Sequence, residues 1–249
     1  MEENNNKNFA HWFFDLDNTI YSANSGIFDQ IHKKMGEFIS SSLQVSLEKA
    51  KILQKKYFIE NGTTLHGLMV NHNTDPRKFL NYVHDIDFSI VKPDEELNDL
   101  IKKISGKKII FTNADISYVK KILTNLNLNN VFDDIYDIER MNFLPKPNMK
   151  TYKKLINTYN VDVKKAILFD DIPQNLLPAA KLGLKTVHVY NKKLDKELNG
   201  RSKKVEQESK SNANFFMSQL VKKHIYDCYP KRFERLEEES PNIRIFWIQ

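Results

Sequence analysis

The 249-residue sequence contains one cysteine, Cys228, so the chain cannot form an internal disulfide. This excludes the small secreted proteins that disulfides hold together, and it favours a reducing compartment. The sequence has no run of 18 apolar residues, so no segment is predicted to span a membrane. The polar start, residues 1–6, lacks the charged and then apolar pattern of a signal peptide. We therefore expect a cytoplasmic location.

Glycine is scarce, with 7 residues, which argues against a glycine-rich phosphate loop and favours a helix-rich fold. The excess of basic over acidic residues is also small. The net charge is +6, and residues 192–249 hold 13 basic and 9 acidic residues, against 25 and 23 in residues 1–191. The basic linker at 192–214 contains little arginine and no aromatic residues interleaved with its charges, so it gives no strong signal for nucleic-acid binding. The remaining composition, 41% hydrophobic and 28% charged, is that of a globular protein.

Short apolar runs alternate with helical periodicity along most of the chain. Strands are predicted at 11–14, 107–111, 132–138, 166–169 and 186–189, with helices at 94–104, 116–126, 148–159 and 173–182. From about residue 26 to residue 85 the pattern is that of four successive helical stretches, with a break at Asn61-Gly62. This alternation predicts an α/β fold, a Rossmann-like parallel sheet with helices on both faces, interrupted by an inserted helical cap.

The same pattern divides the chain into domains. We expect residues 9–22 and 91–191 to form the α/β core and residues 23–90 the cap, with a polar lead-in at 1–8. Residues 192–249 are predicted to be a linker and C-terminal extension, with a flexible stretch at 192–214, a helix at 215–229 and a strand-like or simply apolar end at 243–248.

Two pairs of carboxylates follow predicted strands. Asp15 and Asp17 come directly after the first strand, and Asp170 and Asp171 end the strand at 166–169. The carboxyl ends of parallel strands meet at the edge of the sheet where α/β proteins bind ligands. Carboxylate oxygens suit Mg²⁺, and a carboxylate can attack phosphorus. The plainer interpretations are a polar turn for the first pair and a helix cap before Pro173 for the second.

Three further polar residues lie at or after strand ends. Thr112 and Asn113 end the strand at 107–111, where a hydroxyl and an amide before a helix can cradle a phosphate, or can cap that helix. Lys146 lies in the loop after the strand at 132–138, where it can neutralise an anion or lie solvated at the surface.

The order of these residues resembles the four motifs of the haloacid dehalogenase-like (HAD) hydrolase superfamily, over about residues 9–191. Within that superfamily, the stretch from Phe14 to Tyr21 and the cap segment from Tyr57 to His72 are similar to the motifs of the pyrimidine 5′-nucleotidase family. The resemblance implies a HAD-like fold with Mg²⁺ as cofactor.

The resemblance also implies roles for these residues. Asp15 would be the nucleophile and a metal ligand, and Asp17 the acid/base, with its backbone carbonyl on the metal. Lys146 would offset the charge of the nucleophile and the phosphate. Thr112 and Asn113 would hold phosphate oxygens, and Asp171, with Asp170 as a further candidate, would complete the metal site. The candidates for substrate contact are Tyr21, Thr64, His66 and His72, together with Thr63.

Four of the five substrate candidates have a plainer interpretation. Thr63 and Thr64 can simply start a helix, His72 can pack on the core, and Tyr21 can pack under the cap.

The function that the resemblance implies is a Mg²⁺-dependent phosphatase that hydrolyses a nucleoside monophosphate through a phospho-aspartate. The alternatives are a phosphatase for another small phosphate ester and a catalytically idle scaffold that acts through its C-terminal extension. The sequence leaves the oligomeric state open.

Overall fold

The core strands pair mostly in parallel because helices carry the chain back between them. The computed structural model describes residues 9–191 and 243–248. Its strands are β1 (His11–Phe14), β2 (Lys107–Phe111), β3 (Asp134–Tyr136), β4 (Ala166–Asp170), β5 (Lys185–Asn191) and β6 (Ile243–Ile248). They form one sheet in the order β3-β2-β1-β4-β5-β6. The first five strands are parallel and β6 is antiparallel to β5, so the predicted α/β fold with a parallel sheet is confirmed.

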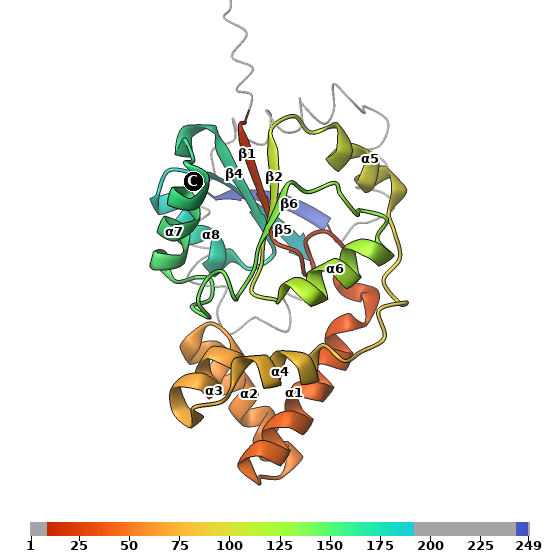
Figure 1. Cartoon of the computed structure of the whole chain (residues 1–249), viewed down its shortest axis with the longest axis vertical. Coiled ribbons are helices and arrows are strands. Elements are labelled where there is room, and N and C mark those ends of the chain that lie inside the picture. Colours follow the sequence, from red (N-terminus) through yellow and green to blue (C-terminus); the bar gives the residue numbers. More distant parts are fainter. Residues whose placement is uncertain (1–8, 192–242, 249) are drawn as a thin grey trace, which may run out of the picture.

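Helices cover both faces of this sheet (Figure 1). They are α5 (Glu95–Lys103), α6 (Ile116–Asn125), α7 (Met149–Tyr159) and α8 (Pro173–Lys181), with a short 3₁₀ turn at Val163–Lys165. Successive strand residues point to opposite faces. Phe14 accordingly packs in a cluster with Val119 of α6, whereas its neighbour Phe13 packs in a cluster with Leu155 of α7. The predicted placement of helices on both faces is therefore confirmed.

The helical block between β1 and β2 consists of α1 (Ile27–Leu43), α2 (Leu47–Asn61), α3 (Thr64–His72) and α4 (Pro76–Val83), after a 3₁₀ turn at Ala23–Ser25. Ser46 caps α2 by accepting a hydrogen bond from the backbone of Lys49 at 3.2 Å. Gly62 ends α2 with a φ of +83°, a conformation that favours glycine. The predicted inserted cap is thus present.

The cap lies beside the carboxyl ends of the parallel strands (Figure 1). The turn between α2 and α3 touches the core, since a Cβ on Gly62 would lie 3.2 Å from the carbonyl oxygen of Lys146. β1 is central in the sheet, with β2 and β4 on either side. The residues that follow these three strands therefore lie together at the edge that faces the cap.

Parts of the predicted organisation fall on residues that the structure does not describe. The lead-in at 1–8, the linker at 192–214 and the helix at 215–229 lie outside the described residues. Residues 243–248 of the expected extension form β6 and join the core sheet, while the division into domains stays a prediction. Among residues 9–191 and 243–248, no helix has both the length and the apolar character that a membrane crossing requires.

Candidate active site

The loop after β1 places the first pair of carboxylates. The backbone N–H of Asp15 donates to the carbonyl of Phe169 on β4 at 2.8 Å, so the ladder between the strands continues one residue past β1. Thr19 Oγ1 donates to Asp15 Oδ2 at 3.3 Å. Asn18 has a φ of +58°, and this left-handed residue turns the chain directly after Asp17. The turn holds Asp15 at the sheet edge with one oxygen bonded by its own loop.

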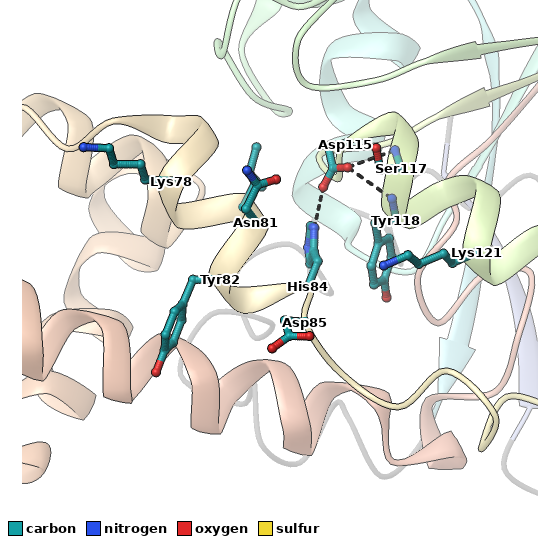
Figure 2. A pocket seen from close by; sticks show the side chains of 10 residues that line it. Lys78, Asn81, Tyr82, His84, Asp85, Asp115, Ser117, Tyr118 and Lys121 are labelled. Carbon is teal, nitrogen blue, oxygen red and sulfur yellow. Dashed lines mark hydrogen bonds and ion pairs between the residues drawn. The ribbon is translucent and has the colours of Figure 1, made fainter.

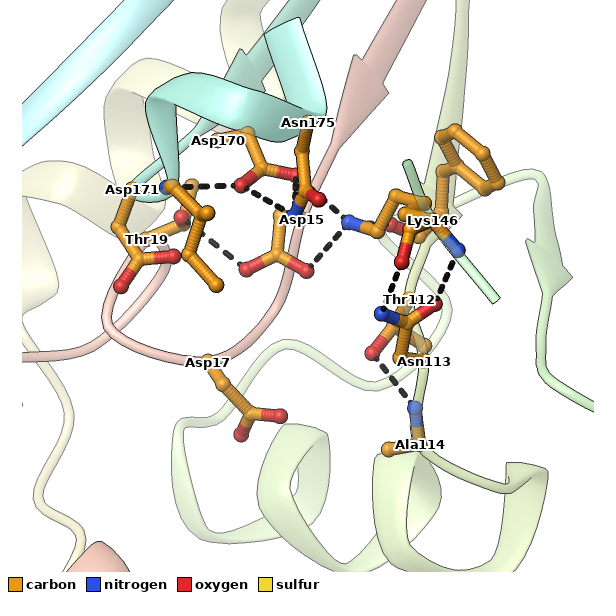
Figure 3. Close-up of polar contacts among 12 residues, drawn as sticks. Asp15, Asp17, Thr19, Thr112, Asn113, Ala114, Lys146, Asp170, Asp171 and Asn175 are labelled. Carbon is orange, nitrogen blue, oxygen red and sulfur yellow. Dashed lines mark hydrogen bonds and ion pairs between the residues drawn. The ribbon is translucent and has the colours of Figure 1, made fainter. Parts of the chain in front are cut away.

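Lys146 is the centre of the polar network (Figure 3). Its Nζ donates to Asp15 Oδ1 at 2.8 Å, to Asp170 Oδ2 at 2.7 Å and to the carbonyl of Phe111 at 2.8 Å. The side chain is 1% exposed. An ammonium group at this depth is stable only if it is paired and fully hydrogen-bonded, and these three acceptors provide that. The alternative of a solvated surface lysine is therefore wrong.

Asp170 is fully buried and accepts hydrogen bonds on both oxygens. Besides Lys146, Asn175 Nδ2 lies 2.9 Å from Oδ1 and 3.1 Å from Oδ2, and the backbone N–H of Ile172 donates to Oδ1 at 2.9 Å. These donors hold Asp170 rigidly and make it an anchor for the lysine.

Asp171 follows the same strand and lies on the side of Asp15 that is opposite to Lys146 (Figure 3). Its Oδ2 accepts a hydrogen bond from Asn18 at 3.2 Å. One carboxylate oxygen from each of Asp15, Asp170 and Asp171 lies within 4.8 Å of the others, which makes these residues a group that could hold a metal ion.

The charges of this cluster are unbalanced, because three carboxylates share one ammonium group. Burial raises the pKa of Asp15 to about 7, although Lys146 acts in the opposite direction. Burial and the charges of Asp15 and Asp170 also raise the pKa of Asp171. Burial alone would lower the pKa of Lys146, but the two carboxylates outweigh it and raise that pKa. A divalent cation would supply the missing positive charge, so the donor set fits Mg²⁺.

Thr112 and Asn113 lie at the end of β2, next to this cluster. Thr112 is buried, and its Oγ1 accepts a hydrogen bond from the backbone N–H of Ala114 at 3.1 Å. The side chain of Asn113 instead binds the backbone of Lys146: Oδ1 accepts from its N–H at 2.8 Å, and Nδ2 donates to its carbonyl at 3.3 Å. The amide thus fixes the lysine loop. Within the part of the chain that the structure describes, no acceptor takes the hydroxyl hydrogen of Thr112, which leaves it for a ligand oxygen.

Asp17 lies apart from the cluster (Figure 3). Its Oδ1 accepts hydrogen bonds from Tyr21 at 2.5 Å and from Tyr118 at 2.8 Å. Burial raises the pKa of Asp17, and the two hydroxyls partly oppose that rise. Tyr21, a candidate for substrate contact, is therefore a partner of Asp17 in this structure.

The candidate residues of the cap differ in whether their polar side-chain atoms already have hydrogen-bond partners. Thr63 caps α3 by accepting from the backbone of His66 at 3.1 Å, and Thr64 Oγ1 donates to the carbonyl of Gln54 at 3.2 Å. His72 is exposed, and its Nε2 lies 2.6 Å from the hydroxyl of Tyr57. His66 Nδ1 is buried without a hydrogen-bond partner in the part of the chain that the structure describes. Of these residues, His66 has an atom available for a ligand.

Sequence reasoning missed several residues of the site. Thr19 and Asn18 lie within the first motif and could have been found from their proximity to Asp15. Asn175 lies in the first turn of α8, one helical turn after Asp171, so its spacing was a usable signal. Tyr118 gave no signal, because its position in α6 fits an ordinary apolar helix face.

The parallel sheet, the inserted cap and the acidic strand edge define a capped α/β protein with a candidate metal-binding active site. Residues 12–189 match the family model described as haloacid dehalogenase-like hydrolase. The match covers more than half of the sequence, and the chain therefore belongs to the haloacid dehalogenase-like hydrolase family. This match does not distinguish the pyrimidine 5′-nucleotidase family within it.

Individual relatives are more distant. Phosphate metabolism protein 8 of Saccharomyces cerevisiae is 27% identical over an alignment of 192 residues, which covers 70% of this chain and 59% of that protein. The chain thus spans about 59% of the length of this curated relative. L-2-haloacid dehalogenase of Xanthobacter autotrophicus is 12% identical, with a TM-score of 0.48 over 74% of this chain and 78% of that chain. The HAD-hydrolase YfnB of Bacillus subtilis, in a form bound to magnesium, is 16% identical, with a TM-score of 0.47 over 72% and 85%.

Proposed function

We propose that this chain is a Mg²⁺-dependent phosphomonoesterase in which Asp15 attacks phosphorus. The supporting observation is that Lys146 Nζ contacts both Asp15 (2.8 Å) and Asp170 (2.7 Å) at a buried strand edge that also holds Asp171. An anionic carboxylate approaches an anionic phosphate only where positive charge lies beside both of them. A fixed ammonium group next to the attacking oxygen meets that requirement.

The proposed reaction has two steps. In the first, an oxygen of Asp15 forms a bond to phosphorus while the bond from phosphorus to the leaving oxygen breaks, and Asp17 gives that oxygen a proton. In the second, a water molecule attacks phosphorus and gives a proton to Asp17. The bond between phosphorus and Asp15 then breaks, which releases phosphate and restores both carboxyl groups.

Of the three clustered carboxylates, those of Asp15 and Asp171 are the proposed metal ligands. The oxygens of Asp170 are already bonded by Lys146, Asn175 and a backbone N–H, so Asp170 acts as the anchor. The Asp17 carbonyl stays a predicted ligand. When bound, Mg²⁺ would neutralise negative charge on the phosphate. Thr112 is the side-chain donor to a phosphate oxygen, and Asn113 contributes by holding the Lys146 loop.

We further infer that the leaving group is a nucleoside, as in the pyrimidine 5′-nucleotidases that the sequence resembles. The support comes from the turn between α2 and α3, where Gly62 lies against the peptide of Lys146. Close to that turn, Asn61 Oδ1 and His66 Nδ1 are buried without hydrogen-bond partners among the described residues. A ring nitrogen and an amide oxygen suit the donor and acceptor edge of a base.

The same geometry weighs against the other candidate activities. Dehalogenation expels a halide, which leaves as a stable anion and needs neither a proton nor a metal. Asp17 and the surplus carboxylates would have no part in that reaction. A catalytically idle scaffold would not need a buried lysine bonded to the nucleophile position.

The test is a panel of substrates assayed with Mg²⁺ and with a chelator. The panel contains UMP, CMP, a sugar phosphate, p-nitrophenyl phosphate and 2-chloropropionate. Phosphate release from UMP or CMP should require Mg²⁺, and Asp15→Asn should lower it by at least about 10³-fold because the nucleophile is lost. Asp99→Asn is the matched control, since Asp99 is 64% exposed on α5 and away from the site.

Each other outcome removes a defined part of the proposal. A clear preference for the sugar phosphate would refute the nucleoside inference and keep the phosphatase. Chloride release from 2-chloropropionate without phosphate release would refute the phosphatase. If full-length protein turned over no ester with any divalent cation, the idle scaffold would replace it.

A further inference from the structure

Two tyrosine hydroxyls hold Asp17. Tyr21 and Tyr118 both donate to Asp17 Oδ1, at 2.5 Å and 2.8 Å, and their hydroxyl oxygens are 3.1 Å apart. A phenol has one hydrogen to donate, so both hydroxyl hydrogens are committed to the same carboxylate oxygen. Tyr118 is 1% exposed and Tyr21 is 7% exposed, which leaves neither ring free to turn. The position of Asp17 is therefore set by these two side chains.

Tyr118 also touches the chain segment that leaves the cap. The ring of His84, directly after α4, lies over the Tyr118 ring with 4.3 Å between centroids, and Phe88 packs edge-on at 5.5 Å. His84 Nδ1 is hydrogen-bonded to Asp115, the N-cap residue of α6 (Figure 2). These contacts bind the returning segment to the helix that carries Tyr118.

The segment that enters the cap reaches the same point, because Tyr21 lies between β1 and α1. Both connections between core and cap thus meet at the carboxylate of Asp17. His84 and Tyr118 also line an open pocket of about 660 Å³ between α4 and α6, together with Asn81 and Lys121 (Figure 2).

We propose that Tyr118 is a positioning residue, which holds Asp17 in place for proton transfer to the leaving oxygen and, through His84, couples the placement of the cap to that carboxylate. The proposal rests on the proposed phosphatase function. The reaction that it governs is the proton transfer from Asp17 as the phosphorus–oxygen bond breaks.

The test compares two leaving groups in full-length enzyme with Mg²⁺. A nitrophenolate leaves without a proton, whereas an alkoxide, as from UMP or the best alkyl phosphate found, needs one. Tyr118→Phe keeps the ring and removes the hydroxyl. We expect kcat for the alkyl phosphate to fall by at least about 10-fold and kcat for p-nitrophenyl phosphate to change by less than about 3-fold.

Tyr159→Phe is the matched control, because the Tyr159 hydroxyl also binds a carboxylate, Asp134 at 2.8 Å, but at the β3 edge of the sheet. Its kcat should stay at the wild-type value for both substrates. If Tyr118→Phe unfolds, Tyr21→Phe removes the second hydroxyl and should give the same selective loss. Thermal unfolding of each variant shows whether it folds.

Equal losses on both substrates would overturn the positioning role, since they would mean that the hydroxyl serves only packing. Unchanged kcat on both would overturn it as well. The cap coupling has its own test, a double-mutant cycle of His84→Ala with Tyr118→Phe on the alkyl phosphate. Non-additive losses support coupling through Tyr118, and additive losses overturn it. A wild-type enzyme that hydrolyses no ester would instead refute the proposed function itself.

Discussion

Replacing Lys146 by methionine should strongly destabilise the metal-free protein. The ammonium group is 1% exposed and donates three hydrogen bonds of 2.7–2.8 Å. Methionine fills a similar volume without charge, so the change isolates the electrostatic contribution. It leaves the carboxylates of Asp15 and Asp170 buried without their cation, which costs about 3–5 kcal/mol when one partner of a buried pair is lost.

That free energy converts to a shift that is easy to measure. For a protein of about 150–250 residues, 1 kcal/mol lowers Tm by about 2–4 °C, so Lys146→Met should lower it by about 6–20 °C. The assay is thermal unfolding at neutral pH in a chelator. The matched control is Lys102→Met, because Lys102 is 47% exposed and lies 3.9 Å from Asp99. Such a surface pair contributes about 0–1 kcal/mol.

Added Mg²⁺ gives a second readout. A ligand at 100 times its Kd stabilises the folded state by about 2.7 kcal/mol. The shift should be larger in Lys146→Met than in wild type, because the cation then faces carboxylates with no ammonium group beside them. A fall in Tm of less than about 2 °C in the chelator would refute the assignment of Lys146 as the buried counter-ion.

Three further predictions follow from packing, metal binding and pH. Gly67→Ala should lower stability by about 1–3 kcal/mol in chemical denaturation, since its Cβ would lie 2.3 Å from Cβ of Tyr57. Gly36→Ala, also inside a cap helix but with no contact within 4 Å among the described residues, should raise stability by about 0.5–1 kcal/mol. Asp171→Asn should weaken Mg²⁺ binding by at least about 10-fold in calorimetry, since a charged ligand is lost. Burial acts to raise the pKa of Asp134, but hydrogen bonds from a guanidinium and a phenol outweigh it and lower that pKa below its ordinary 3.8. The folded state then holds the proton less tightly than the unfolded state, so this contribution is present above about pH 4 and is lost at lower pH. Asp134→Asn should remove this part of the loss of stability at acid pH, which amounts to less than about 1 kcal/mol.

Each of these has an outcome that would contradict it. Equal effects of the two alanine substitutions would mean that α2 and α3 do not pack as closely as described. Unchanged Mg²⁺ affinity in Asp171→Asn would remove Asp171 from the metal site. If Asp134→Asn left the loss of stability at acid pH unchanged, that loss would have to come from other groups.

The site residues that the sequence identified share one property, their position at the ends of strands. Asp15, Thr112 and Asp170 could be found because parallel strands bring their carboxyl ends to one edge, whatever the details of the side chains. Lys146 needed the family resemblance, because nothing in its own loop separates it from a surface lysine.

Contacts between distant side chains could not be predicted in the same way. Tyr118 meets Asp17 across 101 residues, and its hydroxyl looks like any other on an amphipathic helix. The amide of Asn113 was expected on a phosphate oxygen, but its distance to the backbone of Lys146 is set by how two loops pack. The pairing of β6 with β5 likewise depends on a register that an apolar run at 243–248 does not specify.

Lys146 also has a consequence for how the sheet opens. A single nitrogen atom is bonded to the residue after β1, to the last carbonyl of β2 and to the last residue of β4. These three strand ends cannot fray one at a time, because freeing any of them exposes a buried charge. Their backbone amides should therefore exchange with solvent deuterium at one common rate set by global unfolding, whereas the amides at the ends of the cap helices exchange through smaller local openings.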